Sequence, residues 1–146
     1  MSRLLFALPL LFVLGCSGRP GGEIELTVLG RSDYCGLDMS WQRIRSSDEI
    51  PDALPRVGIQ DDSTTLVISM GTQPTGGFRI VLPEHATREG SDAHLNVRLD
   101  APAPDAMVTQ ALTSPCVLIR LAITPETPLR VEFSGTAAEA RNRVRE

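Results

Sequence analysis

Three cysteines and two histidines are the side chains best suited to nucleophilic or metal chemistry in this sequence. A catalytic Cys116 would need His85 or His94 as its base, and no local signature supports that role. The two histidines are expected to flank a loop and do not form a metal-binding pattern. Neither Gly-x-Ser-x-Gly nor His-Glu-x-x-His occurs, and Asp61-Asp62 is expected in a solvated turn. The sequence therefore predicts a noncatalytic protein without a metal or cofactor.

The first cysteine follows an apolar run. Arg3 precedes the apolar residues 4–14, a length typical of signal peptides, whereas a spanning helix needs about 20 residues. The Leu-Gly-Cys sequence ending at Cys16 resembles the lipobox of bacterial lipoproteins, whose cysteine receives a diacylglyceryl group. We therefore expect a signal peptide over residues 1–15, lipid on Cys16 and a flexible tether over residues 16–22. The alternative is an ordinary secretory signal peptide with Cys16 as a bystander.

Lipid on Cys16 predicts that the protein is anchored in the bacterial cell envelope. Each buried methylene contributes about 0.8 kcal/mol, so two or more acyl chains anchor a protein stably. Ser17 stands where an aspartate would follow the lipidated cysteine, and by resemblance to sorted lipoproteins this favours the outer membrane, facing the periplasm. The membrane is therefore one predicted partner.

The other two cysteines form an even pair. With lipid on Cys16, Cys35 and Cys116 remain in a compartment that permits disulfides, and a bridge between them is expected. Such a bridge would stabilise the fold by about 4 kcal/mol in the chain-entropy model.

The length and net charge of the chain limit the number of domains and the kinds of partner that it can have. The chain has 146 residues and a net charge of −4 at pH 7, which suits one domain with a real core and offers nothing to attract nucleic acid.

Apolar residues alternate with polar ones in several short segments, the pattern of half-buried strands. Residues 117–123 are instead apolar on both faces except for Arg120, which indicates a central strand. Over residues 23–135 we expect an all-β domain of about seven short antiparallel strands, in a small β-sandwich or a partly open barrel. The alternating segments are residues 24–28, 66–70, 78–82, 95–99 and 129–133.

Evidence for helices is limited to two possible capping boxes. Ser46-x-x-Glu49 is followed by Pro51, which restricts any helix there to about one turn. A second box begins at Thr136, and residues 136–146 are expected to be a frayed helix or a disordered tail. At most one or two short helices are predicted.

Two further segments are distinctive. Residues 70–78 read Met-Gly-Thr-Gln-Pro-Thr-Gly-Gly-Phe, in which the proline pre-sets a turn and the glycines permit positive φ or close backbone approach. Residues 102–116 read Pro-Ala-Pro-Asp-Ala-Met-Val-Thr-Gln-Ala-Leu-Thr-Ser-Pro-Cys, a proline-fixed loop leading to the expected disulfide.

In this order, these segments resemble the C-terminal domain of the PrcB-like protease complex subunit family. The family's Gly-x-x-Pro-Thr-Gly-Gly-aromatic turn falls at residues 71–78, its Pro-x-Pro at 102–104 and its Val-Thr-Gln-Ala-x-Thr-x-Pro at 108–115. The resemblance covers about residues 64–123. It implies an accessory lipoprotein that supports assembly or stability of an envelope protease, and it does not imply catalysis.

Candidate partner contacts are Pro74, Thr75, Gly76, Gly77 and Phe78, because a turn with little side chain lets a partner backbone come close. Two alternatives remain open. The protein could be a structural envelope lipoprotein without a protease partner. It could also be an inhibitor, since the turn looks like the Asn-Pro-Thr-Thr-Gly-Phe loop of chagasin-type cysteine protease inhibitors, although their other loops have no match here.

Overall fold

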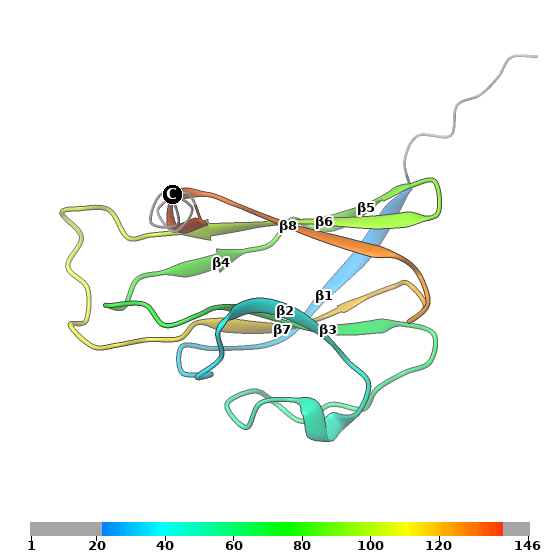
Figure 1. The fold of residues 1–146 in the computed structure, drawn as a ribbon, viewed down its shortest axis with the longest axis horizontal. Helices are drawn as coiled ribbons and strands as arrows, with labels where there is room; N and C mark the ends of the chain where they lie inside the picture. The colour runs from blue at the N-terminus through cyan, green and yellow to red at the C-terminus, as the bar shows by residue number, and fades with distance from the viewer. Residues whose placement is uncertain (1–21, 139–146) are drawn as a thin grey trace, which may run out of the picture.

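The computed structural model describes residues 22–138, and this part of the chain forms an all-β domain with eight strands, one short 3-10 helix and a few helical residues at 136–138 (Figure 1). The predicted fold class is confirmed, with eight strands in place of about seven. The elements are β1 (Glu23–Ser32), β2 (Met39–Ile44), η1 (Ser47–Glu49), β3 (Thr64–Met70), β4 (Arg79–Val81), β5 (His85–Glu89), β6 (Asp92–Asp100), β7 (Cys116–Leu121) and β8 (Leu129–Ser134).

The strands form two layers that share β1 and make a nearly closed barrel. Their order is β2-β3-β7-β1-β5-β6-β4, with β8 paired to β6. The first residues of β1 pair with β5 and the rest with β7, so this strand passes from one layer to the other (Figure 1).

One strand pair departs from the predicted antiparallel arrangement. β8 runs parallel to β6, while the other pairings of the described strands are antiparallel. The connection from β7 crosses from one layer to the other before β8 begins, so β8 enters the sheet beside β6 in the same direction.

The main core lies between the two layers and is built from alternate residues of the strands. The alternation predicted for β6 and β8 is confirmed, since Leu95, Val97 and Leu99 are fully buried and the apolar residues of β8 pack against them. Fully buried side chains of this core also include Leu66, Ile68, Met70, Val117, Ile119 and Leu121.

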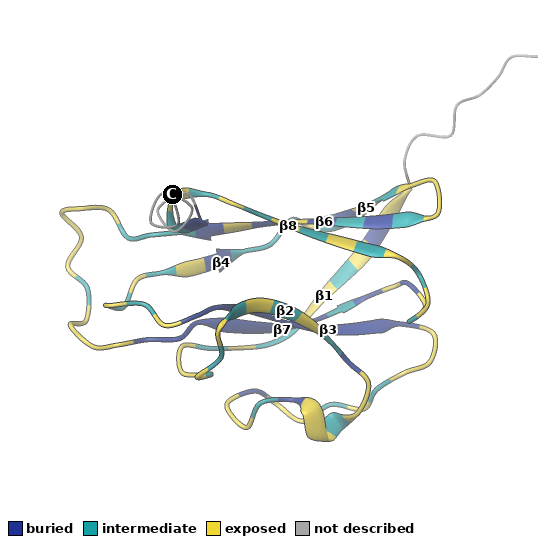
Figure 2. Cartoon of the chain, viewed as in Figure 1, coloured by how far each residue is buried: buried dark blue, intermediate teal, exposed yellow. Residues whose placement is uncertain are grey.

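A second apolar cluster covers the outer face of β3 and β7. Residues between β2 and β3 fold back over these strands, and Figure 2 shows both strands buried along their length. The central position of β7, between β3 and β1, was predicted correctly. The half-buried prediction for β3 was wrong, because Ile50 and Leu54 from the covering segment bury its second face.

The alternation predicted for β1 holds only in its first part. Ile24 is buried in the main core, whereas Val28 is 44% exposed. The register with β7 shifts between Val28 and Gly30, and Leu29 packs into the second cluster. This β-bulge changes the facing of the side chains that follow it, so the alternation of the first part of β1 does not continue beyond Val28.

The single turn of helix predicted after Ser46 is present as η1. The Ser46 side chain accepts a hydrogen bond from the backbone N–H of Asp48, and Glu49 Oε2 accepts one from the N–H of Arg45. No helix within residues 22–138 is long and apolar enough to cross a membrane.

The first residues of the expected tail, 136–138, are helical. Ala138 is buried against the main core. The rest of the expected tail lies outside the described residues, as do the signal peptide, Cys16 and most of the tether.

Candidate functional site

The turn between β3 and β4, residues 71–78, lies against the long connection between β6 and β7. We call this connection, residues 101–115, the strap. The Gly76 N–H donates to the Thr109 carbonyl at 2.9 Å, and Thr113 Oγ1 donates to the Thr75 carbonyl at 2.8 Å. Gln73 and Thr113 exchange two backbone hydrogen bonds of 2.7 and 3.0 Å. The two distinctive segments of the sequence are therefore one structural unit.

The two glycines of the turn differ in how much room the strap leaves for a side chain. Gly77 has a φ of +84°, and a Cβ placed there would lie 2.7 Å from Val108 Cγ1 and 3.0 Å from Pro102 Cβ. A Cβ on Gly76 would lie 3.4 Å from Thr109 Cβ, which is ordinary contact. We expected the backbone of a partner to lie close to these glycines. Instead, this chain's own strap lies there.

The remaining side chains of the turn point in different directions. Pro74 is exposed, Thr75 is half-buried, and Phe78 is half-buried because it packs against the main core. Of these three predicted contacts, Pro74 is the one fully available at the surface. Phe78 also lines a groove beside β4, which is described below.

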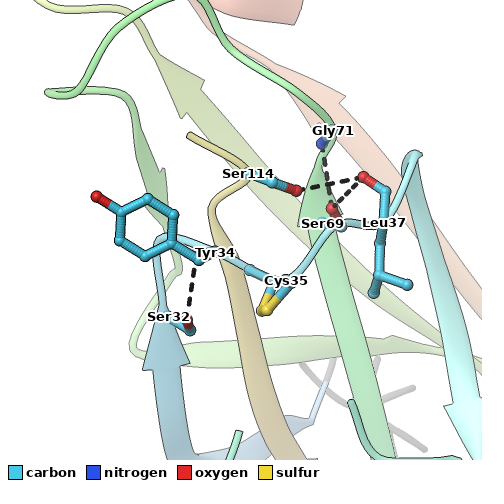
Figure 3. The surroundings of a disulfide bond; sticks show 8 residues. Ser32, Tyr34, Cys35, Leu37, Ser69, Gly71 and Ser114 are labelled. Carbon is cyan, nitrogen blue, oxygen red and sulfur yellow. Dashed lines mark hydrogen bonds between the residues drawn. A yellow bond between two sulfur atoms is a disulfide. The ribbon is translucent and has the colours of Figure 1, made fainter. Parts of the chain in front are cut away.

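The disulfide ties the end of the strap to the segment that follows β1. Cys35 and Cys116 are joined, with their Cα atoms 6.1 Å apart, so the structure contains the predicted bridge and leaves Cys116 no free thiol. Beside it, the Leu37 carbonyl accepts hydrogen bonds from Ser69 Oγ and Ser114 Oγ, as Figure 3 shows. The residues after β1 are therefore held next to the start of β7.

Exposed apolar side chains gather on these connected segments. Met107 and Leu112 of the strap are 101% and 69% exposed, and Tyr34 is 67% exposed. The Tyr34 ring points away from the disulfide (Figure 3), and its backbone bridges to Ser114 at the end of the strap. We call the surface formed by Tyr34, Pro74, Met107 and Leu112 the loop end. Its segments project from the same end of the barrel in Figure 1.

Sequence reasoning missed three of the four residues of the loop end. The available signal was the presence of Met107 and Leu112 among prolines and polar residues, outside any alternating pattern. Apolar residues outside an alternating pattern do not lie on the buried face of a strand. Their presence in this segment therefore indicates surface exposure.

The histidines lie on either side of a hairpin turn. His85 begins β5 and His94 lies in β6, and the turn between these strands is at Gly90. His94 Nε2 is 3.6 Å from Glu89 Oε2. Within residues 22–138, no group of three or more His, Cys, Asp and Glu side chains is arranged to hold a metal ion.

Comparison with known families agrees with the two motifs. Residues 64–122 match the family model described as PrcB C-terminal, a range that contains β3, the turn, the strap and β7. No curated protein and no solved structure matches the chain significantly.

Proposed function

Because residues 64–122 match the PrcB C-terminal family model, we propose that this chain is a noncatalytic, lipid-anchored binding module that assembles with an envelope protease and stabilises it. The family match is the observation that carries the proposal. The protease partner is what the resemblance to the PrcB-like protease complex subunit family implies. Both motifs that define the resemblance lie within the matched range and pack against each other.

The loop end is the surface that we assign to this binding role. Its apolar side chains are in contact with water, which is unfavourable unless a partner covers them. The strap that carries Met107 and Leu112 is fixed by prolines and by its hydrogen bonds to the turn. A surface that is already ordered loses little conformational entropy on binding, so a rigid loop end favours association.

We expect wild-type protein to capture a protease that a loop-end variant does not. The epitope-tagged full chain would be purified from detergent-solubilised envelopes, and its partners would be identified by mass spectrometry and by peptidase activity. Met107→Ser with Leu112→Ser removes two exposed apolar contacts and should weaken protease binding by about thirtyfold, since interface anchors contribute about 1 kcal/mol or more each. Neither side chain belongs to the core, so the fold should be unaffected.

Val28→Ser is the matched control for that experiment. Val28 is also an exposed apolar residue, but it lies on β1, away from the strap. It should leave protease recovery unchanged. Equal recovery with the wild type and the double variant would reject the loop end as the binding surface. Failure of the wild type to recover any protease would favour the alternative of a structural envelope lipoprotein.

Membrane attachment is a separate prediction. Cys16→Ala removes the thiol that would carry the diacylglyceryl group, so the protein should move from the membrane pellet to the soluble fraction, or remain as an unprocessed precursor. Incorporation of radiolabelled palmitate into the wild type, and its loss in the variant, is the measurement. Label that persists in Cys16→Ala would contradict lipidation at this residue.

A further inference from the structure

A groove of about 430 Å³ lies between the end of β1 and the strand β4. It opens where β1 leaves β5: the first residues of β1 pair with β5, whereas Arg31 and Ser32 pair with β7 alone. Residues 31–33 form one wall, residues 78–82 form the other, and Pro115 and Cys116 complete the lining. Two strands of the barrel thus diverge beside this groove.

Among the strands of residues 22–138, β4 pairs with β6 alone, and the groove runs along its other, free edge. The N–H of Ala93 in β6 donates to the Pro128 carbonyl, on the side of β8. Backbone groups of alternate residues in a strand point to the same side, so Leu99 also directs its N–H and C=O toward β8. Leu99 lies opposite Ile80, and this pair is therefore not hydrogen-bonded. Consequently the N–H and C=O of Ile80 point away from β6, into the groove.

A hydrogen bond across the groove agrees with this orientation. Arg31 Nη1 donates to the Ile80 carbonyl at 2.8 Å. An arginine side chain therefore occupies the acceptor that a neighbouring strand would use. A strand edge with backbone groups outside the ladder is a template for another extended chain, and proteins often cover such edges with charged side chains.

The lining determines which extended chain would fit. Phe78, Leu82 and Pro115 offer apolar surface, while Arg31 and Arg79 provide two positive charges against one carboxylate, that of Asp33. Neither arginine forms an ion pair with any residue in the range 22–138. The groove is thus locally positive on a chain whose net charge is −4, and it complements an acidic ligand.

We propose that this groove binds an extended, acidic peptide segment of a partner protein, which adds a strand to the free edge of β4. The peptide backbone hydrogen-bonds to the N–H and C=O of Ile80, a small apolar side chain contacts Phe78, and a carboxylate bonds Arg31 and Arg79. Arg31 exchanges the Ile80 carbonyl for that carboxylate, to which it binds more strongly because both groups are charged. From the proposed function, this inference takes only the premise that the chain has a protein partner.

Peptide titration tests this surface without the protease. The probe is the acetylated, amidated peptide Ser-Val-Glu-Val-Thr-Ser, added to the purified, isotope-labelled full chain in detergent micelles. It should shift the amide resonance of Ile80 and slow hydrogen exchange at that N–H. A matched peptide with lysine for glutamate, and one N-methylated at both valines, should each bind about tenfold more weakly, since one removes the carboxylate and the other the strand hydrogen bonds.

Two chain variants complete the experiment. Arg31→Gln should reduce the affinity for the glutamate peptide by about tenfold and leave the affinity for the lysine peptide unchanged. Arg45 is an exposed arginine outside the groove, so Arg45→Gln should alter the affinity for neither peptide. The proposal is overturned if the glutamate peptide does not bind, binds without a change at Ile80, or binds no better than its lysine or N-methylated counterpart. If protease capture persists after such a result, only the groove is rejected and the proposed function stands.

Discussion

Gly77→Ala should lower the free energy of unfolding by about 3 kcal/mol, because it combines backbone strain with a steric clash. The φ of +84° places the residue where an L side chain is strained. The new methyl group would also lie 2.7 Å from Val108 and 3.0 Å from Pro102. A β-branched side chain and a proline ring have few alternative rotamers, so neither can move aside easily. Urea denaturation followed by circular dichroism is the measurement.

Two glycines of the same chain separate the contributions to that effect. Gly76→Ala meets Thr109 at an ordinary 3.4 Å and has no positive φ, so it should destabilise the protein by about 1 kcal/mol or less. Gly36 has a φ of +67° but open space around it. Gly36→Ala should therefore lower the free energy of unfolding by about 1 kcal/mol, from backbone strain alone. If Gly77→Ala proved no more harmful than these two variants, the packing of the turn against the strap would be disproved.

Removal of the disulfide should lower the free energy of unfolding by a similar amount. Cys35→Ser with Cys116→Ala opens a loop whose ends are 81 residues apart in sequence, and the chain-entropy model assigns about 4 kcal/mol to such a closure. Reductant should lower the unfolding midpoint of the wild type to nearly that of the double variant. It should leave the double variant itself unchanged.

Thiol labelling provides the control for the disulfide prediction. Wild-type protein unfolded without reductant should show no reactive thiol at Cys35 or Cys116, and both should react after reduction. Since Cys116 is 2% exposed in the folded chain, labelling must be done in denaturant. Free thiol at either position before reduction, together with a midpoint insensitive to reductant, would refute the bridge.

The strands predicted from sequence are those whose apolar residues alternate with polar ones or form a continuous apolar run. β2 and β5 were missed because their inward positions are not uniformly apolar. In β2 the inward face includes Arg43, whose guanidinium donates to the Pro125 and Thr127 carbonyls. In β5 the buried apolar residue is Ala86. β2 is held by its pairing with β3, which follows after the covering segment, and β5 by its pairing with β1 as well as by its hairpin with β6. The pairings with β3 and β1 join segments that are separated in sequence, and that information is absent from a local pattern.

The candidate site was predicted in part. The turn, the strap and the cysteine pair were recognisable because proline, glycine and cysteine impose local or covalent constraints that a sequence displays directly. Their mutual contact was not recognisable. Assigning Gly76 and Gly77 to a partner's backbone was a reasonable local inference, but Pro102, Val108 and Thr109 occupy that space.

The sequence by itself determined the all-β class, the central strand β7, the pairing of Cys35 with Cys116, and the match of residues 64–122 to the PrcB C-terminal family model. These features follow from side-chain periodicity, from composition and from short motifs. Only the tertiary structure decided that the motifs pack on each other, that the loop end is exposed, and that β4 keeps a free edge beside Arg31. Each of these depends on which distant segments the barrel brings together, and strand register is set by long-range packing that no local pattern contains.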